Sequence, residues 1–390
     1  MKVVFVSNYF NHHQMQFCDI MYKLVDDFIF VATSQMREER KKLGYGNLKI
    51  PTYVNYTYKS DKELAQCQSF IDNADVVIFG SAPEYLLKKR KKEKRLIFRY
   101  SERIIKKKTG IFDYFIKLIK LNIKMRGKNQ YLLCASAYAY GDFIKFGLFK
   151  GKSYKWGYFP ETIKYDIDIL MYQKNFTEIL WCGRLIDWKH PEVVIEVGKK
   201  LKNEGYKFHI TIIGSGIMEQ VIDSIIKDYQ LEDFVTIMGA VPPEQVREYM
   251  KKAGIYLVTS NFQEGWGAVV NEAMNSGCAV VASHAVGSVP FLLKNKENGL
   301  IYQNDNTEDL FNKVRFLLNN PLKQKEFGTR AYETVLSLWN ANVAAQHFLD
   351  LVQRINKEYD FDLYLDGPCS RAEIIKNRWF KNEKNTEVSN

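Results

Sequence analysis

At 390 residues, 46% of them hydrophobic and 26% charged, the chain is too long for one ordinary core and suits two soluble domains. Its six cysteines are scattered without a CxxC pair, which favours reduced core thiols in a reducing compartment. The N-terminal apolar run is too short for a signal peptide, and no segment approaches about 18 uncharged apolar residues. We therefore expect a cytoplasmic protein without a membrane span.

The positive net charge of +11 is concentrated in the first part of the chain. Residues 1–155 carry 30 Lys and Arg against 14 Asp and Glu, whereas the remainder carries 26 against 31. This imbalance predicts that one domain meets an anionic partner. Nucleic acid, anionic lipid headgroups and a phosphate-bearing acceptor all fit, and charge alone does not choose among them.

Short apolar runs recur through the first half of the chain and predict strands. A polar loop, Asn8–Gln14, follows the first run, and helical spacing then continues to about Val25. Runs that are apolar throughout are typical of strands buried on both faces of a parallel sheet. The predicted strands are Val3–Ser7, Phe28–Thr33, Asp75–Phe79, Leu96–Tyr100 and Tyr131–Ala135.

Two basic clusters, Lys88–Arg95 and Arg103–Lys108, precede a predicted amphipathic helix over Ile111–Lys124. One face of this helix would carry Ile111, Phe112, Phe115, Ile116, Ile119 and Ile123, and the other faces Lys117, Lys120 and Lys124. Such a helix beside basic runs indicates contact with a membrane surface. The alternative is a helix packed on the core with a solvated lysine face.

The second half alternates strands and helices with a period of roughly 25 residues, as the βαβ units of a doubly wound sheet do. Predicted strands are Ile179–Cys182, Phe208–Ile213, Val235–Met238, Ile255–Val258 and Ala279–Ala282. Predicted helices are Pro191–Asn203, Met218–Tyr229, Pro243–Lys252, Val269–Ser276, Glu308–Leu318, Lys323–Leu338 and Val343–Lys357. We expect the boundary between the domains after Trp156–Pro160, which gives domains over 1–165 and 166–338. A helix over 339–358 and an extension over 359–390, disordered after Asn382, complete the chain.

The segment Ser260–Ser283 has the residues that a diphosphate site needs. Gly265 and Gly267 would let the backbone approach a ligand without a Cβ clash. The start of the following helix, which ends near Gly277, would present unpaired N–H groups and a positive dipole end to phosphate. Glu264 in the loop and Glu272 in the second turn of that helix could accept hydrogen bonds from sugar hydroxyls.

The run from Glu264 to Glu272, E-G-W-G-A-V-V-N-E, resembles the E-x7-E element of retaining glycosyltransferases of family four. The resemblance extends in order over residues 178–318. It includes Gly183-Arg184 with Lys189, the turn Gly214-Ser215-Gly216, and Asn298-Gly299-Leu300 before the last strand. The family has the GT-B fold, so the resemblance implies an α/β protein with two Rossmann-like, doubly wound parallel-sheet domains facing across a cleft.

The resemblance also implies roles for individual residues. Arg184 and Lys189 would neutralise the diphosphate of the donor as its glycosidic bond breaks, Glu264 would hold the transferred sugar, and Glu272 would bind the ribose. The implied donor-binding residues are Gly183, Arg184, Lys189, Gly214, Ser215, Gly265, Trp266, Gly267, Ala268, Val269 and Glu272. The alternatives are a surface ion pair at Arg184 and Lys189, a plain strand-end turn at Gly214, and solvated helix-end acids at Glu264 and Glu272.

The first domain departs from the family pattern at two loops. The loop after the first strand has no glycine, so Asn11, His12 and His13 could donate hydrogen bonds to phosphate or sugar instead. Alternatively Asn11 caps a helix and the histidines face solvent; a metal-ligand interpretation of the histidines has no supporting cluster. Where many members place a histidine, this chain has Ser101-Glu102-Arg103. We expect Glu102 in catalysis and Arg103 near acceptor or phosphate, with a local ion pair as the alternative.

The function that follows is a retaining, hexosyltransferase-type enzyme in bacterial capsule or exopolysaccharide synthesis. The acceptor would be a glycan, carried on lipid, and would place the protein peripherally at the inner face of the cell membrane. No DxD element is evident, so neither a metal nor another cofactor is expected. Frequency within the resembled family implies a UDP-sugar as the donor first and a GDP-sugar second. The alternatives are a nucleotide-sugar epimerase of similar fold, or a non-catalytic nucleotide-binding or nucleic-acid-binding protein.

Overall fold

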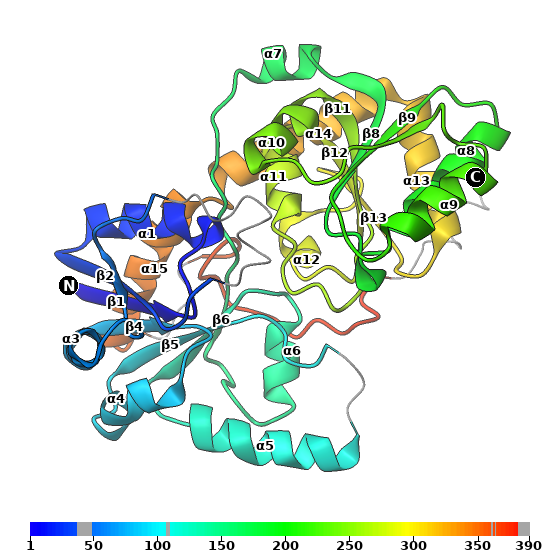
Figure 1. The fold of residues 1–390 in the computed structure, drawn as a ribbon. Helices are drawn as coiled ribbons and strands as arrows, with labels where there is room; N and C mark the ends of the chain where they lie inside the picture. The colour runs from blue at the N-terminus through cyan, green and yellow to red at the C-terminus, as the bar shows by residue number, and fades with distance from the viewer. Residues whose placement is uncertain (37–48, 107–109, 360–361, 363, 381–390) are drawn as a thin grey trace. The chain divides into compact units, whose positions relative to one another are not determined.

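A computed structural model describes residues 1–36, 49–106, 110–359, 362 and 364–380 (Figure 1). The chain forms two compact units. Unit 1 comprises Met1–Glu161 and Leu338–Ile375, and unit 2 comprises Thr162–Ser337 and the residues from Lys376 onward. The boundary between the first and second domains lies at residue 161, whereas the sequence predicted residue 165. The expected C-terminal extension is divided between the units, and its expected disordered end lies outside the described residues.

Unit 1 contains a seven-stranded parallel sheet in the order β3-β2-β1-β4-β5-β6-β7. Interior strands such as β4 are buried at every position, because helices cover both faces of the sheet. The strands are β1 (Lys2–Ser7), β2 (Asp27–Ala32), β3 (Val54–Tyr56), β4 (Val76–Phe79), β5 (Leu96–Ser101), β6 (Gln130–Cys134) and β7 (Ser153–Lys155).

Helices α1 and α15 cover one face of this sheet, where Phe17 and Phe348 pack against each other and Phe17 also packs against Phe5. The remaining helices cover the other face. There, Ile71 of α3 belongs to the same core cluster as Val6 of β1. The helices are α1 (His12–Leu24), α3 (Asp61–Asn73), the short 3-10 helix η2 (Glu84–Leu87), α4 (Lys88–Lys92), α5 (Ile111–Met125), α6 (Ala139–Ile144) and α15 (Ala341–Asn356).

The segment after α15 protects the open edge of the unit 1 sheet. Lys155 of β7 donates its N–H to the Ser370 carbonyl at 2.8 Å, and Cys369 donates back to the Lys155 carbonyl at 2.8 Å. Ala372 donates to the Ser153 carbonyl at 3.0 Å. An edge strand with unpaired backbone groups can pair with other chains, so these bonds close the edge of β7.

Unit 2 contains a six-stranded parallel sheet in the order β10-β9-β8-β11-β12-β13. The strands are β8 (Asn175–Cys182), β9 (His209–Ile213), β10 (Val235–Ile237), β11 (Ala253–Val258), β12 (Ala279–Ser283) and β13 (Leu300–Tyr302). Counted from its own first strand, this order equals that of the first six strands of unit 1. Both units therefore have the doubly wound topology that the sequence predicts.

The main core of unit 2 lies between the sheet and α8, α9 and α13, with Ile179, Ile210 and Ile255 at its centre. Helices α10, α11 and α14 cover the opposite face. The helices are α7 (Ile167–Tyr172), the 3-10 helix η3 (Asp187–Lys189), α8 (Pro191–Asn203), α9 (Glu219–Asp228), α10 (Pro243–Lys252), α11 (Val269–Asn275), α12 (Val289–Leu292), α13 (Thr307–Asn319) and α14 (Pro321–Ser337). Within the described residues, no helix is long and apolar enough to cross a membrane.

Each sheet has a buried cation at its amino edge. The Arg90 guanidinium donates to the carbonyls of Ile71, Ala74, Asp75 and Leu96 at 2.6–3.3 Å, around the starts of β4 and β5. Arg90 is fully buried, so the expected basic surface cluster over Lys88–Arg95 does not include it. Its role is to satisfy carbonyls that would otherwise be buried without donors.

Lys174 has the corresponding place in unit 2. Its Nζ donates to the carbonyls of Met250, Ala253 and Ser276 at 2.7–2.9 Å, around the start of β11 and before β12. Met250 and Ser276 lie at the ends of α10 and α11, where helix carbonyls lack partners within the helix. Burial lowers the pKa of Lys174.

Candidate functional site

The centre of the unit 2 sheet places two loops side by side. β8 and β11 are neighbours there, and the strand order runs outward from them in opposite directions. Doubly wound sheets bind ligands at such a switch point, beyond the carboxyl ends of the strands. The loop after β8 carries Gly183, Arg184 and Lys189, and the loop after β11 carries Glu264.

Lys189 and Glu264 form an ion pair across these loops. The Lys189 Nζ lies 2.5 Å from Oε2 of Glu264, and Ser260 donates its hydroxyl to the same oxygen at 3.1 Å. The two side chains are only 13% and 12% exposed. Glu264 is therefore not the solvated acid that was the alternative interpretation.

A chain of hydrogen bonds holds the two loops together beneath this pair. Trp181 donates its indole N–H to the Thr259 hydroxyl at 2.8 Å, and Thr259 donates to the Lys189 carbonyl at 2.7 Å. The Asn261 N–H donates to the Trp188 carbonyl at 3.0 Å. Because Trp181 is buried in the core, these bonds anchor the position of Lys189 to the sheet.

Arg184 lies in the same loop as Lys189, and its side chain is exposed. Its guanidinium carbon is 5.7 Å from the centre of the Trp188 ring, and the Lys189 ammonium is 5.1 Å from that centre. Both distances allow a cation–π interaction. The two cations named from the sequence are thus brought to one aromatic ring.

Glu272 lies in the first turn of α11, one turn earlier than predicted. Burial raises the pKa of its carboxyl, and the charge of Arg247 acts in the opposite direction. Burial, helped by the Glu272 charge and opposed by Lys189, raises the pKa of the Cys182 thiol to about 12. Cys182 ends β8, so the carboxyl end of this strand has Glu272 and Lys189 as electrostatic neighbours.

The glycines of the Gly214-Ser215-Gly216 turn have a reason within the fold. A Cβ on Gly214 would collide with the Gly183 carbonyl, and one on Gly216 with the Leu185 carbonyl. The Leu185 N–H donates to the Ser215 carbonyl at 2.9 Å. The turn therefore packs directly on the loop that carries Arg184 and Lys189, and supports its backbone.

Two features of the Gly265–Val269 segment bear on its expected role, in which its backbone binds phosphate or sugar. The Trp266 side chain is fully buried and donates its indole N–H to Asn271 at 2.8 Å, so this ring belongs to the core. Helix α11 has only seven residues, too few for a strong macrodipole, and Ala268 at its start has no side chain that could cap it. Any anion there would depend on the first backbone N–H groups. Gly267, at φ +84°, has the left-handed backbone that favours glycine.

Unit 1 brings together three segments that the sequence singled out. The Tyr158 hydroxyl donates to Glu102 at 2.6 Å, and the Lys106 ammonium donates to the same carboxylate at 2.9 Å. The Tyr158 ring stacks on His13, with centroids 5.5 Å apart and planes 4° apart. His13 follows β1 and Glu102 follows β5, so this group lies at the carboxyl edge of the unit 1 sheet.

Among the other predicted residues of unit 1, Asn11 has the capping role that was its alternative interpretation, and Arg103 differs from its expected place. Asn11 accepts the His13 N–H at 3.0 Å and caps α1, so the expected loop ends at Asn11 and His12 begins the helix. Arg103 is buried and pairs with Asp142 at 3.3 Å. Asp142 also accepts two backbone N–H groups of the loop, so Arg103 belongs to the support of that loop. Residues 107 and 108 of the second basic cluster lie outside the described residues.

Sequence reasoning missed several groups at these edges. Thr259 and Ser260 carry hydroxyls whose role appears only when the two loops are paired. Near the same edge of unit 2, His284 donates its Nε2–H to the Asn377 carbonyl at 3.0 Å, and Trp379 donates to the His284 carbonyl at 3.4 Å. Tyr158 lies in the boundary segment W-G-Y-F-P, and this position was the only signal that could have pointed to it.

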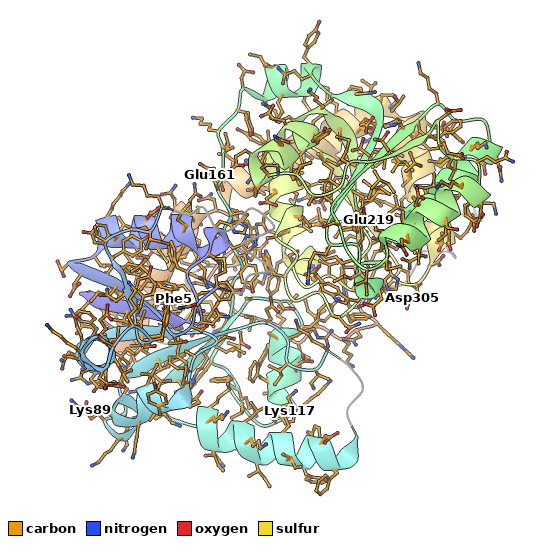
Figure 2. The ribbon with its side chains drawn as sticks, viewed as in Figure 1. Phe5, Lys89, Lys117, Glu161, Glu219 and Asp305 are labelled. Atoms are coloured by element: carbon orange, nitrogen blue, oxygen red, sulfur yellow. The ribbon has the colours of Figure 1, made fainter. Side chains whose placement is uncertain are left out.

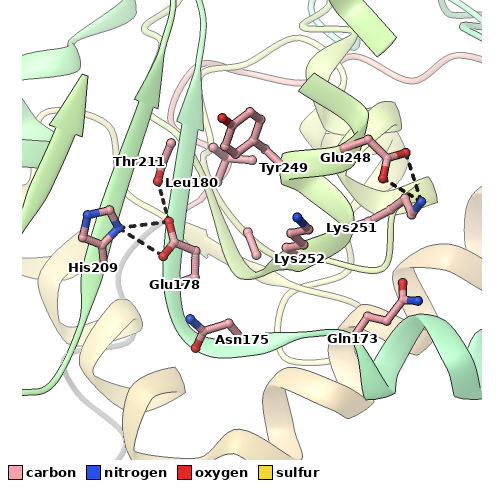
Figure 3. Close-up of a pocket in the computed structure, with 11 residues that line it drawn as sticks. Gln173, Asn175, Glu178, Leu180, His209, Thr211, Glu248, Tyr249, Lys251 and Lys252 are labelled. Atoms are coloured by element: carbon pink, nitrogen blue, oxygen red, sulfur yellow. Dashed lines mark hydrogen bonds and ion pairs between the residues drawn. The ribbon is translucent and has the colours of Figure 1, made fainter. Parts of the chain in front are cut away.

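A cavity of about 640 Å³ opens at the other end of the unit 2 sheet (Figure 3). It is lined by Asn175 and Glu178 near the start of β8, by His209 at the start of β9, and by the end of α10. Glu178 accepts the Thr211 hydroxyl at 2.6 Å and lies 3.1 Å from His209. This cavity is at the amino edge of the strands, so it is distinct from the predicted site.

A known protein family matches the part of the chain that contains the site in unit 2. Residues 168–334 match the family described as Glycosyl transferases group 1, and this span contains Arg184, Lys189, Glu264 and Glu272. This region is thus similar to group 1 glycosyl transferases. It lies within unit 2, and the four residues occupy its carboxyl edge.

Solved structures give the fold of the whole chain. HepE of Anabaena, determined in complex with UDP, aligns over 90% of this chain and 100% of its own, with a TM-score of 0.68 and 16% identity. At that identity the likeness shows the fold alone, which is GT-B with two parallel-sheet α/β domains.

Curated relatives match shorter stretches. Poly(ribitol-phosphate) alpha-N-acetylglucosaminyltransferase of Staphylococcus aureus is 29% identical over 172 residues, 43% of this chain and 34% of that protein. The amylovoran biosynthesis glycosyltransferase AmsK of Erwinia amylovora is 36% identical over 126 residues, 31% of each chain. The chain thus spans about a third of the length of these two relatives.

Proposed function

We propose that this protein is a retaining glycosyltransferase that moves a hexose from a nucleotide-sugar to a glycan acceptor. The observation that carries the proposal is the Lys189–Glu264 pair at the β8–β11 switch point, inside the region that matches the glycosyl transferase family. A cation and a carboxylate held together at a ligand-binding edge suit a substrate that joins a diphosphate to a sugar.

We assign the roles of the residues in unit 2 as follows. Lys189 and the exposed Arg184 would neutralise the diphosphate as it leaves, and preorganised charge of this kind contributes most when charge develops in the transition state. Both described hydrogen bonds to Glu264 reach Oε2, so we assign Oε1 to hydroxyls of the transferred sugar. Glu272 would accept the ribose hydroxyls. UDP is the preferred nucleotide; the HepE structure of the same fold holds UDP.

The chemical step we propose takes place on the face of the sugar from which the diphosphate departs. The acceptor hydroxyl attacks the anomeric carbon, the bond to the diphosphate breaks, and a phosphate oxygen takes the hydroxyl proton. The two cations would supply the charge stabilisation that a divalent metal supplies elsewhere, so transfer would continue in the presence of a chelator.

Unit 1 would bind the acceptor near Glu102, His13 and Tyr158. We propose a lipid-linked glycan of a bacterial surface polysaccharide as the acceptor, and therefore work at the inner face of the cell membrane. The AmsK and Staphylococcus aureus relatives, whose names refer to amylovoran biosynthesis and to poly(ribitol-phosphate), support this class of acceptor. Arg103 is left out of the proposed contacts because it is buried against Asp142.

A thermal-shift panel of nucleotides and nucleotide-sugars tests the donor site. A nucleotide at about 100 times its Kd should stabilise the protein by about 2.7 kcal/mol. This shift should disappear in Arg184→Ala and Glu272→Ala and persist in two controls, Arg330→Ala on α14 and Glu244→Ala in the first turn of α10. No shift with any nucleotide would contradict the proposal.

A transfer assay with the stabilising nucleotide-sugar tests the reaction. The anomeric configuration of the product, measured by NMR, should equal that of the donor, and chelation should leave the rate unchanged. Conversion of the donor sugar without any acceptor would instead indicate an epimerase. An obligatory divalent metal would overturn the role assigned to Arg184 and Lys189.

A further inference from the structure

Helix α5 leaves a continuous apolar stripe uncovered on the surface of unit 1. Phe112, Phe115, Ile116, Ile119 and Ile123 are between 37% and 76% exposed. They repeat at spacings of three and four residues, so they lie on one face of the helix. The side chain of Ile111, expected on the same face, lies outside the described residues. Single exposed apolar residues are ordinary, but a stripe of five needs an explanation.

The stripe is not required to hold α5 in place. The opposite face of the helix packs through Leu118, Leu121 and Met125 against the core beside β6 and α6. Tyr114 on that face donates its hydroxyl to the Lys145 carbonyl at 2.7 Å. The helix is thus docked by one apolar face and presents a second one outward. The core-packed face that was the alternative expectation is present, together with the exposed apolar face.

The surroundings of the stripe are strongly basic. Residues 1–84 carry 9 Lys and Arg against 10 Asp and Glu, whereas residues 85–155 carry 21 against 4. The whole positive excess of unit 1 therefore lies in the part of the chain that contains α5. On α5 itself, Lys120 and Lys124 are exposed along one border of the stripe.

Helix α4 adds charge next to the end of α5. Lys91 donates its ammonium to the carbonyls of Ile123 and Lys124 at 3.1 and 2.9 Å, which places α4 against the last turn of α5. Lys88, Lys89 and Lys92 of α4 are exposed. Figure 2 shows Lys89 on α4 and Lys117 on α5 on the same side of unit 1.

We propose that α5 lies in the headgroup region of an anionic lipid bilayer. The stripe would enter the boundary of the acyl chains, while the lysines of α5 and α4 would meet lipid phosphates. The concentration of positive charge around a single exposed helix face favours anionic lipid over an apolar groove of another protein. This inference deepens the proposed function by naming the element that would meet a lipid-linked acceptor, but binding to lipid needs neither donor nor acceptor.

Vesicle flotation with the full chain tests the proposal. Vesicles of phosphatidylcholine alone are compared with vesicles that also contain phosphatidylglycerol, at low and high salt. The protein should bind the anionic vesicles at least about tenfold more strongly, and salt should weaken binding. Equal binding to both vesicles, or none to either, would overturn the proposal.

Matched variants locate the contact. F112S/I119S/I123S and K120E/K124E should each reduce binding to anionic vesicles at least about tenfold. Leu322→Ser, at an 83% exposed residue of α14, and Lys325→Glu on the same helix should leave it unchanged. Unfolding curves show whether each variant is folded, and unchanged nucleotide-dependent stabilisation shows that the donor site is intact. If the α5 variants bound vesicles as the wild type does, the assignment to α5 would be wrong.

Size-exclusion chromatography separates lipid from a protein occupant. The proposal expects the same elution of the wild type and F112S/I119S/I123S without vesicles. A dimer that this variant converts to a monomer, together with no vesicle binding, would show that the stripe joins two copies of the chain. Absence of any nucleotide effect would contradict the proposed function and leave the vesicle result valid.

Discussion

Unit 1 and unit 2 resemble each other at the amino edge of their sheets and differ at the carboxyl edge. At the amino edge, Arg90 bonds carbonyls around β4 and β5, and Lys174 bonds carbonyls around β11 and β12. These strand pairs have the same place in the two sheets. The same architecture leaves buried carbonyls at the same corner, and one buried cation satisfies them in each unit.

The carboxyl edges carry different chemistry. In unit 2 the switch point has an ion pair, Lys189 with Glu264, held by loops that pack through glycines. In unit 1 the corresponding edge has Glu102 bonded to Tyr158, which stacks on His13. The comparison teaches that the shared scaffold determines the amino edge, whereas the carboxyl edges of the two units differ in their side-chain chemistry. Four predictions test it.

The largest effects are expected at the buried cations. Arg90→Met and Lys174→Met each remove a charged donor from three or four backbone carbonyls, which should lower the free energy of unfolding by about 3–5 kcal/mol. Urea denaturation followed by fluorescence measures the loss. Lys92→Met on α4 and Lys252→Met on α10, at exposed lysines, are the controls. If the free energy of unfolding fell by less than about 1 kcal/mol in either Arg90→Met or Lys174→Met, the two buried cations would not have equivalent roles in the two units.

At the carboxyl edge of unit 2, Lys189→Ala should lower the transfer rate about 10²- to 10³-fold, because the departing diphosphate loses a preorganised cation. Steady-state release of the nucleotide measures the rate. Lys199→Ala, at an exposed lysine of α8, should retain the wild-type rate. An unchanged rate in Lys189→Ala would mean that the ion pair with Glu264 serves the fold alone.

At the carboxyl edge of unit 1, Tyr158→Phe should lower kcat about tenfold and leave the KM for the nucleotide-sugar unchanged. The variant removes a hydrogen bond to a carboxylate, an interaction that contributes about 1.5–3 kcal/mol, while the ring can still stack on His13. Tyr85→Phe, at an exposed tyrosine, is the control. A raised KM for the donor with normal kcat would instead assign Tyr158 to donor binding.

The smallest effect concerns pH. Burial raises the pKa of Glu272 in the folded protein, so its contribution to stability is present below the unfolded pKa and is lost as the pH rises through the folded pKa. Glu272→Gln cannot ionise and should therefore have a higher Tm than the wild type at pH 7, with the difference vanishing near pH 4. Calorimetry without nucleotide measures the Tm of the wild type and of the variant at each pH. A lower Tm at pH 7 would show that the ionised carboxylate is stabilised in the fold, for example by Arg247.

The local pattern predicted the parts of the fold that depend on neighbouring residues. Apolar runs predicted β4, β8, β9 and β11 within a few residues, and α8 and α10 have the predicted bounds because a proline begins each helix. β3 (VNY) and β7 (SYK) were missed, because neither forms an apolar run. For the site, the order of Gly183, Lys189 and Glu264 along the chain predicted loops at one sheet edge, and the structure pairs Lys189 with Glu264.

What a side chain contacts was decided by the tertiary structure. The apolar face of α8 is buried in the core, whereas one of the two apolar faces of α5 is exposed, although both sequences show helical spacing. Arg90 and Trp266 looked like surface or ligand residues and are buried. The sequence by itself thus determined the doubly wound order of strands and helices, because period and turn residues are local properties. Burial, ion pairing and exposure depend on segments distant in the chain, so only the folded structure determined them.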